Sequence, residues 1–290
     1  MIVVPPPAPE PIRFELLMSQ SWSLFKRNWI VAVPPVIALL VGLAGTAAVL
    51  GAIVANASAH GLFERHAPMP DASFFTPLLT SSLVYAVVML AVSLWSYAAM
   101  YGMADAAWAN GTATFGDGFT AFRTRSGALI VAGIGVACLA FVAAILALPT
   151  LGLALLALPL VTMYAAPAVV SGRCDGFTAI GESFRLVHRF FGASAIALLI
   201  LLAISYGIST VATIPLFPLE LAFLPRPGET MPHIPAVGFL VAAGLWFFLA
   251  MIVAQVYLGY FTLAIVGLYR SLCAQPDARV GQPPGRGLTV

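Results

Sequence analysis

Residues 128–170 read ALIVAGIGVACLAFVAAILALPTLGLALLALPLVTMYAAPAVV and contain no charged side chain. Within this stretch, two apolar runs are separated only by the turn-forming Pro149, Thr150 and Gly152. About 20 apolar residues in an α-helix are enough to cross the hydrocarbon of a bilayer. The stretch therefore predicts a tight hairpin of two membrane-spanning helices.

Four more apolar stretches of at least this length lie outside the hairpin, two before it and two after it. The six predicted spans are residues 30–55, 79–108, 128–148, 151–170, 192–214 and 236–269. The second and sixth are the longest, which predicts tilted or protruding ends. Only 8% of the residues are charged and the mean hydropathy is +1.00, whereas about a quarter of a soluble protein is charged. The predicted fold class is an all-α, polytopic membrane protein with six transmembrane helices.

The basic residues lie almost entirely on one side of these six spans. Of the 13 Lys and Arg residues, only Arg65 and Arg226 fall in the connections on the other side. Because cytoplasmic connections carry the excess of positive charge, the basic side and both chain ends are predicted to be cytoplasmic. A single Lys among these residues, in an Ala-rich and Gly-rich chain, indicates a GC-rich bacterial genome and hence a bacterial inner membrane.

The two ends of the chain are predicted to be flexible tails around one domain. Residues 1–11, MIVVPPPAPEP, are broken by prolines and lack the positive start of a signal peptide, so we expect a retained tail. Residues 12–270 form a single transmembrane domain, and residues 271–290 form a flexible cytoplasmic tail. The three cysteines have no metal-binding or redox spacing.

A five-residue sequence, Asp-Gly-Phe-Thr-Ala, occurs at residues 117–121 and again at residues 175–179. Each copy leads into an amphipathic stretch with Arg, residues 119–126 and 177–191, and then into the third or the fifth span. A diverged instance, residues 21–29, precedes the first span. Two crossings return a unit to the same side of the membrane, so we interpret the pattern as parallel repeats of one interfacial helix and two spans. The units are about residues 12–110, 111–172 and 173–270.

The stretches before the first and fifth spans have the period of an amphipathic helix. The residues that share the apolar face are Met18, Trp22, Phe25 and Trp29 in one stretch, and Phe177, Ile180, Phe184, Val187 and Phe191 in the other. Such a helix can lie in the headgroup plane, with aromatic rings in the acyl boundary and basic groups towards phosphate. The alternative is that these stretches extend the spanning helices into the cytoplasm and pack on one another.

These cytoplasmic stretches supply the candidate contacts with anionic lipid headgroups or with a partner protein. The candidate residues are Lys26, Arg27, Arg123, Arg125, Arg185, Arg189, Trp22, Trp29, Phe184 and Phe191. A homo-oligomer is also compatible with the sequence. A net charge of +2 without an extended basic stripe argues against nucleic acid as a partner.

Two polar residues inside the predicted spans need partners. A carboxylate in hydrocarbon costs several kcal/mol unless it is paired or hydrated. Asp105 lies near the cytoplasmic end of the second span, so we expect an interfacial or capping role, with a proton or substrate role as the alternative. Gln255 lies nearer the middle of the sixth span, and its amide is expected to bond to a neighbouring helix.

No motif of an enzyme or of a cofactor site stands out. His60, Glu64, His66 and Asp71 gather in the first outer loop, but their spacing matches no metal-binding pattern, so we expect solvated loop residues. The chain has no nucleophile elbow, no zinc-hydrolase helix motif and no phosphate-binding loop motif. We therefore expect a non-enzymatic protein without cofactor or metal.

The segment Ser-Trp-Ser-Leu-Phe-Lys-Arg-Asn-Trp at 21–29, its echo Ser-Phe-Arg-Leu-Val-His-Arg-Phe-Phe at 183–191, and the two spans after each form one pattern. This pattern resembles a broad group of bacterial six-helix membrane proteins of unknown function. The group includes the membrane domain fused to some glycerophosphoryl diester phosphodiesterases. The resemblance implies a six-helix membrane unit without its own active site, so phosphodiesterase activity is not expected here.

The pattern of nearly uncharged spans beside a basic and aromatic border favours a lipid-engaging scaffold or an accessory subunit of a membrane complex. One alternative is a carrier or channel for a small apolar or amphiphilic solute. Another is an intramembrane lipid-modifying enzyme, for which the sequence offers no set of acid, base and nucleophile.

Overall fold

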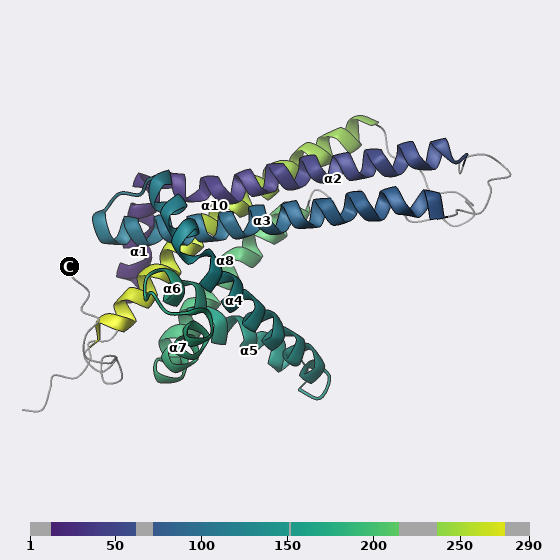
Figure 1. The fold of residues 1–290 in the computed structure, drawn as a ribbon. Helices are drawn as coiled ribbons and strands as arrows, with labels where there is room; N and C mark the ends of the chain where they lie inside the picture. The colour runs from purple at the N-terminus through teal and green to yellow at the C-terminus, as the bar shows by residue number, and fades with distance from the viewer. Residues whose placement is uncertain (1–12, 62–71, 151, 215–236, 276–290) are drawn as a thin grey trace, which may run out of the picture.

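The computed structural model describes residues 13–61, 72–150, 152–214 and 237–275, and its regular structure in these residues is entirely helical (Figure 1). In chain order the helices are α1 (Phe14–Arg27), η1 (Trp29–Ala32), α2 (Val33–Ala59), α3 (Ala72–Asn110), α4 (Phe115–Ala147), α5 (Leu153–Thr162), α6 (Ala165–Val170), α7 (Gly176–Arg189), α8 (Phe191–Thr213) and α10 (Val237–Ala274).

Six helical segments are long and apolar enough to cross a membrane. They are Trp29–Ala59, Ser73–Asn110, Phe115–Ala147, Leu153–Val170, Phe191–Thr213 and Val241–Ala274. Each contains or closely overlaps one predicted span, which confirms the all-α class and the six spans. Helix α10 continues to Ala274, four residues beyond residue 270, where the sequence analysis placed the end of the transmembrane domain. The predicted tail at 1–11 and most of the tail at 271–290 lie outside the described residues.

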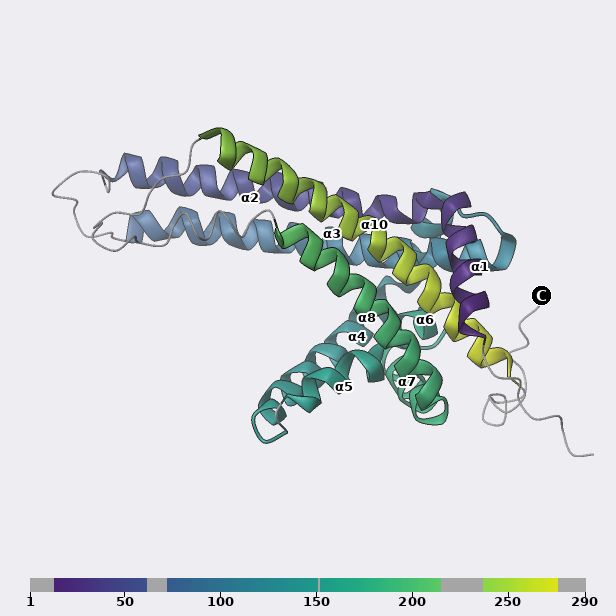
Figure 2. The same ribbon diagram turned by 180° about the vertical axis from the view of Figure 1, so that it is seen from behind.

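The helices diverge from one end of the molecule, where α1, α6, α7 and the end of α10 lie together (Figure 1). Helices α2 and α3 leave this end side by side as a long hairpin, and α10 lies along them (Figure 2). Helices α4 and α5 leave as a second hairpin in a different direction in both views. The molecule therefore has one common end and two separate hairpin arms.

The buried core is concentrated at the common end, and only single described residues such as Ala57 and Ala143 are buried farther out. In three segments most of the residues are buried: 96–107 of α3, 164–169 at α6, and 262–272 of α10. We call these three segments the helical hub. Farther out, α3 exposes Leu79, Leu83 and Leu90. Apolar side chains that lipid can cover need no protein partner, so protein packing concentrates at the hub.

Small residues and a tyrosine hold the long hairpin together. The Tyr85 ring of α3 lies directly over Gly45 of α2, where any side chain would collide with it. The Tyr85 hydroxyl donates to the Gly42 carbonyl at 3.1 Å and lies 2.8 Å from the Thr46 hydroxyl. At the outer end, the Asn56 amide donates to the carbonyl of Phe74 at 2.7 Å. These polar contacts fix the register of α2 against α3.

Candidate functional site

Helices α1 and α7 each lay one face against the hub. Both have 14 residues and end in basic side chains, Lys26 and Arg27 in α1 and His188 and Arg189 in α7. The buried residues are Leu17, Ser21 and Phe25 in α1, and Gly176, Ala179, Ser183, Leu186 and Val187 in α7. The helices thus border the hub at the end where the spans meet.

The predicted apolar stripe of α7 is not its packing face. Phe177, Phe184 and Phe191 are exposed, and of the stripe only Val187 is buried. The predicted stripe of α1 and η1 is only partly buried: Phe25 is buried, whereas Trp22 and Trp29 are exposed. The small residues of α7 pack on the protein because they allow close helix approach, which leaves the large aromatic rings outside.

Helix α1 is fastened to α10 by aromatic contacts. The Tyr260 ring stands edge-on to Trp22 at 5.7 Å and to Phe25 at 6.1 Å between ring centroids. The Tyr260 hydroxyl donates to the Met18 sulfur at 3.4 Å. Aromatic pairs in edge-to-face contact favour such distances, so these residues anchor α1 on the last span.

The chain turns the same corner after α1 and after α7. Asn28 has φ −123° and ψ 42°, and Phe190 has φ −115° and ψ 42°; each ends a 14-residue helix. The next residue is an exposed aromatic in both cases, Trp29 at 66% and Phe191 at 61% exposure. Each corner therefore places a basic residue and an exposed ring on either side of a single break residue.

Asn28 also joins its corner to the connection between α3 and α4, a role that the sequence analysis missed. Its amide nitrogen donates to the carbonyls of Leu24 at 3.0 Å and Gly111 at 3.1 Å. Its side-chain oxygen accepts from the backbone N–H of Ala113 at 2.7 Å. An asparagine after two basic residues is a recognisable helix end, but no sequence signal indicates a partner 85 residues away.

The prediction of a separate interfacial helix at residues 119–126 is wrong. These residues form the first turns of α4, which runs without a break from Phe115 to Ala147. The helix starts with a capping box, in which the Thr114 hydroxyl accepts from the Asp117 N–H and the Asp117 carboxylate accepts from the Thr114 N–H. Here the alternative, in which the stretch extends the spanning helix, agrees with the structure.

The two Asp-Gly-Phe-Thr-Ala copies make similar close contacts with a preceding helix. Gly118 lies against Ala99 of α3, and Gly176 lies against Ala128 and Ala132 of α4, so that a Cβ on either glycine would meet backbone atoms. The phenylalanine after each glycine is exposed. The copies differ in capping, because Asp117 lies inside its helix whereas Asp175 precedes its helix.

The predicted basic contacts lie at this end of the molecule, and they differ in exposure and in their partners. Lys26, Arg27, Arg123 and Arg189 are exposed, and Arg125 is half-buried. Arg185 is exposed but donates to the Glu182 carboxylate at 2.8 Å, which partly neutralises it. The Arg189 guanidinium lies over the Phe190 ring at 5.6 Å. The structure thus gathers these residues along α1, the start of α4 and α7, and not in one pocket.

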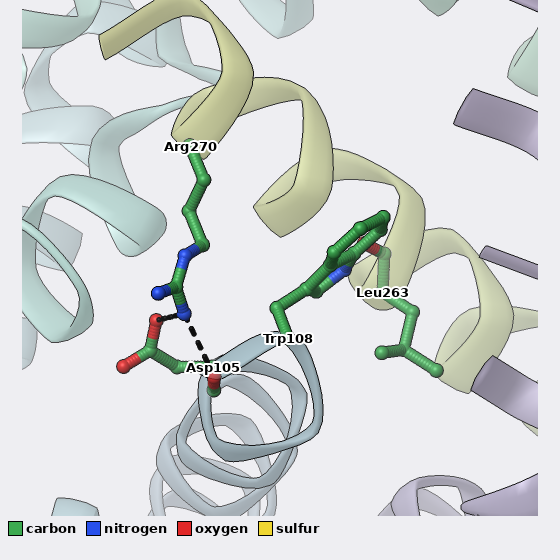
Figure 3. Close-up of polar contacts among 4 residues, drawn as sticks. All are labelled: Asp105, Trp108, Leu263 and Arg270. Carbon is green, nitrogen blue, oxygen red and sulfur yellow. Dashed lines mark hydrogen bonds and ion pairs between the residues drawn. The ribbon is translucent and has the colours of Figure 1, made fainter. Parts of the chain in front are cut away.

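Asp105 is paired, and its partner is Arg270 of α10 (Figure 3). Arg270 Nη1 donates to the Asp105 carboxylate at 3.0 Å and to the Asp105 backbone carbonyl at 2.9 Å. One turn further along α3, the Trp108 indole N–H donates to the carbonyl of Leu263 at 2.8 Å, and its ring covers Gly267. This arrangement joins the first and last segments of the hub through the pairing of Asp105 with Arg270; an interfacial or capping role for Asp105 stays a prediction.

The Asp105–Arg270 pair should contribute about 1 kcal/mol to stability, because both side chains are about one-third exposed. We expect Arg270→Gln to lower the thermal midpoint in detergent more than Asp105→Asn, since it also removes the bond to the backbone carbonyl. The double variant should be no less stable than Arg270→Gln alone. Glu182→Gln, which breaks the pair with Arg185 three residues along α7, serves as the control and should have a smaller effect, since such a pair within one helix contributes about 0.2 to 0.5 kcal/mol. Additive losses from the two hub variants would contradict the pairing.

The other predicted polar sites show no chemical centre. Gln255 is half-buried, and its amide has no hydrogen bond to any described residue, so its expected partner is not found there. His60 lies beside the Ser73 hydroxyl, while Glu64, His66 and Asp71 fall outside the described residues. The described part of the chain has no group of three or more His, Cys, Asp or Glu residues that could hold a metal.

No protein family, curated protein or solved structure matches this chain.

Proposed function

We propose that this protein is a non-enzymatic, lipid-engaging scaffold of the bacterial inner membrane, with the hub end at the cytoplasmic face. The resemblance to bacterial six-helix membrane units fits this role. So does the border of exposed Trp, Phe, Lys and Arg around the hub. In the accessory-subunit form of this proposal, a partner protein contacts the same border in a membrane complex.

The observation that carries the proposal is the repeated corner. At Asn28 and at Phe190, an amphipathic helix turns into a span with a basic residue before the corner and an exposed ring after it. Aromatic rings favour the boundary between headgroups and acyl chains, and basic side chains reach for phosphate. Each corner is therefore suited to hold an anionic headgroup at a fixed depth.

The corners also support the three-unit organisation. Residues 21–29 and 183–191 match in burial, since Ser21 and Ser183 are buried while Trp22 and Phe184 are exposed. The second span of each predicted unit supplies one segment of the hub, 96–107, 164–169 and 262–272. We infer three parallel units that meet through their second spans, with the middle unit lacking a corner because α4 is continuous.

Retention of anionic lipid tests the proposal. We expect Arg185→Ala/Arg189→Ala to reduce the anionic phospholipid that co-purifies with the protein by roughly fivefold to tenfold, since a basic residue near an anionic surface contributes about 1 kcal/mol and Arg185, paired with Glu182, contributes less than that. Lipid mass spectrometry of protein purified from native membranes in mild detergent gives the measurement. Zwitterionic lipid should change little.

The matched control is Arg65→Ala/Arg226→Ala, which removes the same charge from the side predicted to face away from the cytoplasm. Equal lipid loss in both double variants, or none in either, would contradict the proposal. Loss of a stoichiometric protein together with the lipid would favour the accessory-subunit form. Solute flux in reconstituted vesicles that disappears in Asp105→Asn would favour a carrier instead.

A further inference from the structure

The turn between α4 and α5 satisfies several of its polar backbone groups internally, among the residues that the structure describes there. The N–H groups of Thr150 and Gly152 donate to the carbonyls of Leu146 and Ala147 at 3.1 and 2.7 Å. The Leu153 N–H donates to the Thr150 carbonyl at 3.0 Å, and the Leu155 and Leu156 N–H groups donate to the Gly152 carbonyl at 3.0 and 3.3 Å. Pro149 has no N–H to satisfy.

The hydroxyl of Thr150 completes this arrangement. It donates to the Leu146 carbonyl at 2.6 Å and accepts from the Ala154 N–H at 3.3 Å. It therefore bonds to one carbonyl near the end of α4 and to one N–H near the start of α5. Gly152, at φ 84°, takes the left-handed conformation that lets the chain reverse in so few residues.

The side chains of this hairpin end are apolar and uncovered. Leu148 is 88% exposed and Leu153 65% exposed, and Phe141 and Leu156 are exposed as well. The sequence has no charged residue between Arg125 and Arg173. Exposed leucines beside a turn with several internally bonded backbone groups and no charged side chain are suited to hydrocarbon and poorly suited to an aqueous loop.

The long hairpin ends differently. Its outer end carries Asn56, Ser58, His60 and Ser73, and the His60 ring lies 3.1 Å from the Ser73 hydroxyl. Helix α3 has 39 residues, whereas α4 has 33 and departs from the hub in another direction (Figure 1). A tilted and shorter arm reaches less far across the bilayer than the long hairpin.

We propose that the α4–α5 hairpin ends inside the hydrocarbon, where lipid acyl chains cover its apolar tip, while the α2–α3 hairpin reaches water. The tip is then an intramembrane surface for acyl chains, which deepens the proposed lipid-engaging function. If the hub end faces the cytoplasm, as proposed above, the tip lies in the outer leaflet. The depth of the tip in the hydrocarbon does not depend on that orientation.

Nitroxide accessibility in reconstituted vesicles measures this depth. Spin labels are placed at Leu148→Cys and Leu153→Cys after Cys138, Cys174 and Cys273 are replaced by alanine, in vesicles of phosphatidylcholine and phosphatidylglycerol. We expect collisions with oxygen, which partitions into hydrocarbon, to exceed collisions with a water-soluble nickel chelate at both sites. Val87→Cys on the middle of α3 is the hydrocarbon reference, and Ala59→Cys at the end of α2 is the aqueous reference.

Chelate accessibility at Leu148 and Leu153 equal to that at Ala59 would overturn the proposal. An immobilised label shielded from both agents would place a second protein chain on the tip and would overturn it too. As a second measurement, Leu148→Asp should lower the amount of folded protein in membranes severalfold, whereas Ala59→Asp should leave it unchanged, and equal amounts would count against an embedded tip. The depth of the tip does not involve Arg185 or Arg189. The depth measurement can therefore fail while the lipid-retention result holds, and the lipid-retention result can fail while the depth measurement holds.

Discussion

Gly176→Ala should destabilise the protein by about 2 to 3 kcal/mol, because extra atoms in a close-packed contact force the backbone apart. A Cβ at Gly176 would lie 2.6 Å from the Ala128 carbonyl oxygen and 2.7 Å from the Ala132 nitrogen. Both are backbone atoms of α4 and cannot rotate away, so α7 would have to move off the hub. The measurement is the thermal midpoint in detergent, followed by tryptophan fluorescence.

Gly181→Ala, in the same helix, is the matched control. A Cβ at Gly181 would meet nothing within 4 Å. Since alanine is favoured over glycine inside a helix by about 1 kcal/mol, this variant should be slightly more stable than the parent. The two substitutions are chemically identical and should act with opposite sign; a loss of the same size at both positions would show that the contact with α4 is unimportant.

Asn28→Ala should cost about 2 to 4 kcal/mol, since each buried backbone group left without a partner costs about 1 to 3 kcal/mol. The affected groups are the Ala113 N–H and the Gly111 carbonyl, which bond to the Asn28 side chain across the α3–α4 connection. Asn28 is only 3% exposed, whereas Gly111 and Ala113 are half-buried, so water can replace the lost side chain only in part. The same thermal assay gives the loss, and backbone hydrogen exchange at residues 111–114 should rise with it.

Asn110→Ala provides the comparison for that variant. Asn110 is exposed, ends α3 and lies one residue before Gly111. Its replacement should change stability by less than about 0.5 kcal/mol, as is usual for surface positions. If Asn28→Ala were equally mild, the corner after α1 would be held by the aromatic contacts with Tyr260 and not by Asn28.

The spans were predictable because they depend on length and apolarity alone. The turn at Pro149, Thr150 and Gly152 was placed correctly for the same local reason. These features are decided by a few neighbouring residues. The ends of α1 and α7 were missed, because the predicted stretches ran on through Trp29 and Phe191, whereas α1 ends at Arg27 and α7 at Arg189.

The contacts between distant segments could not be predicted. The Asp105–Arg270 pair joins residues 165 positions apart, and nothing in either local sequence selects the other. For the aromatic stripe of α7 the sequence left two readings open, contact with acyl chains or packing on other helices, because periodicity shows which residues share a face but not whether protein or lipid covers it. In a membrane, small residues take the protein side, and Gly176 and Ala179 carried that signal. The continuity of α4 through residues 119–126 was missed because an amphipathic stretch and the first turns of a span have the same composition.

The make-up of the hub also constrains how the protein is synthesised. Its segment at 262–272 belongs to the last helix to be translated, and α1 rests on Tyr260 of that same helix. The α2–α3 hairpin can pair as soon as it leaves the translocon, whereas Trp22, Asp105 and Trp108 must await a partner near the end of the chain. A nascent chain stalled before α10 therefore holds inserted helices with an unfinished centre, the state that membrane chaperones and proteases would meet first.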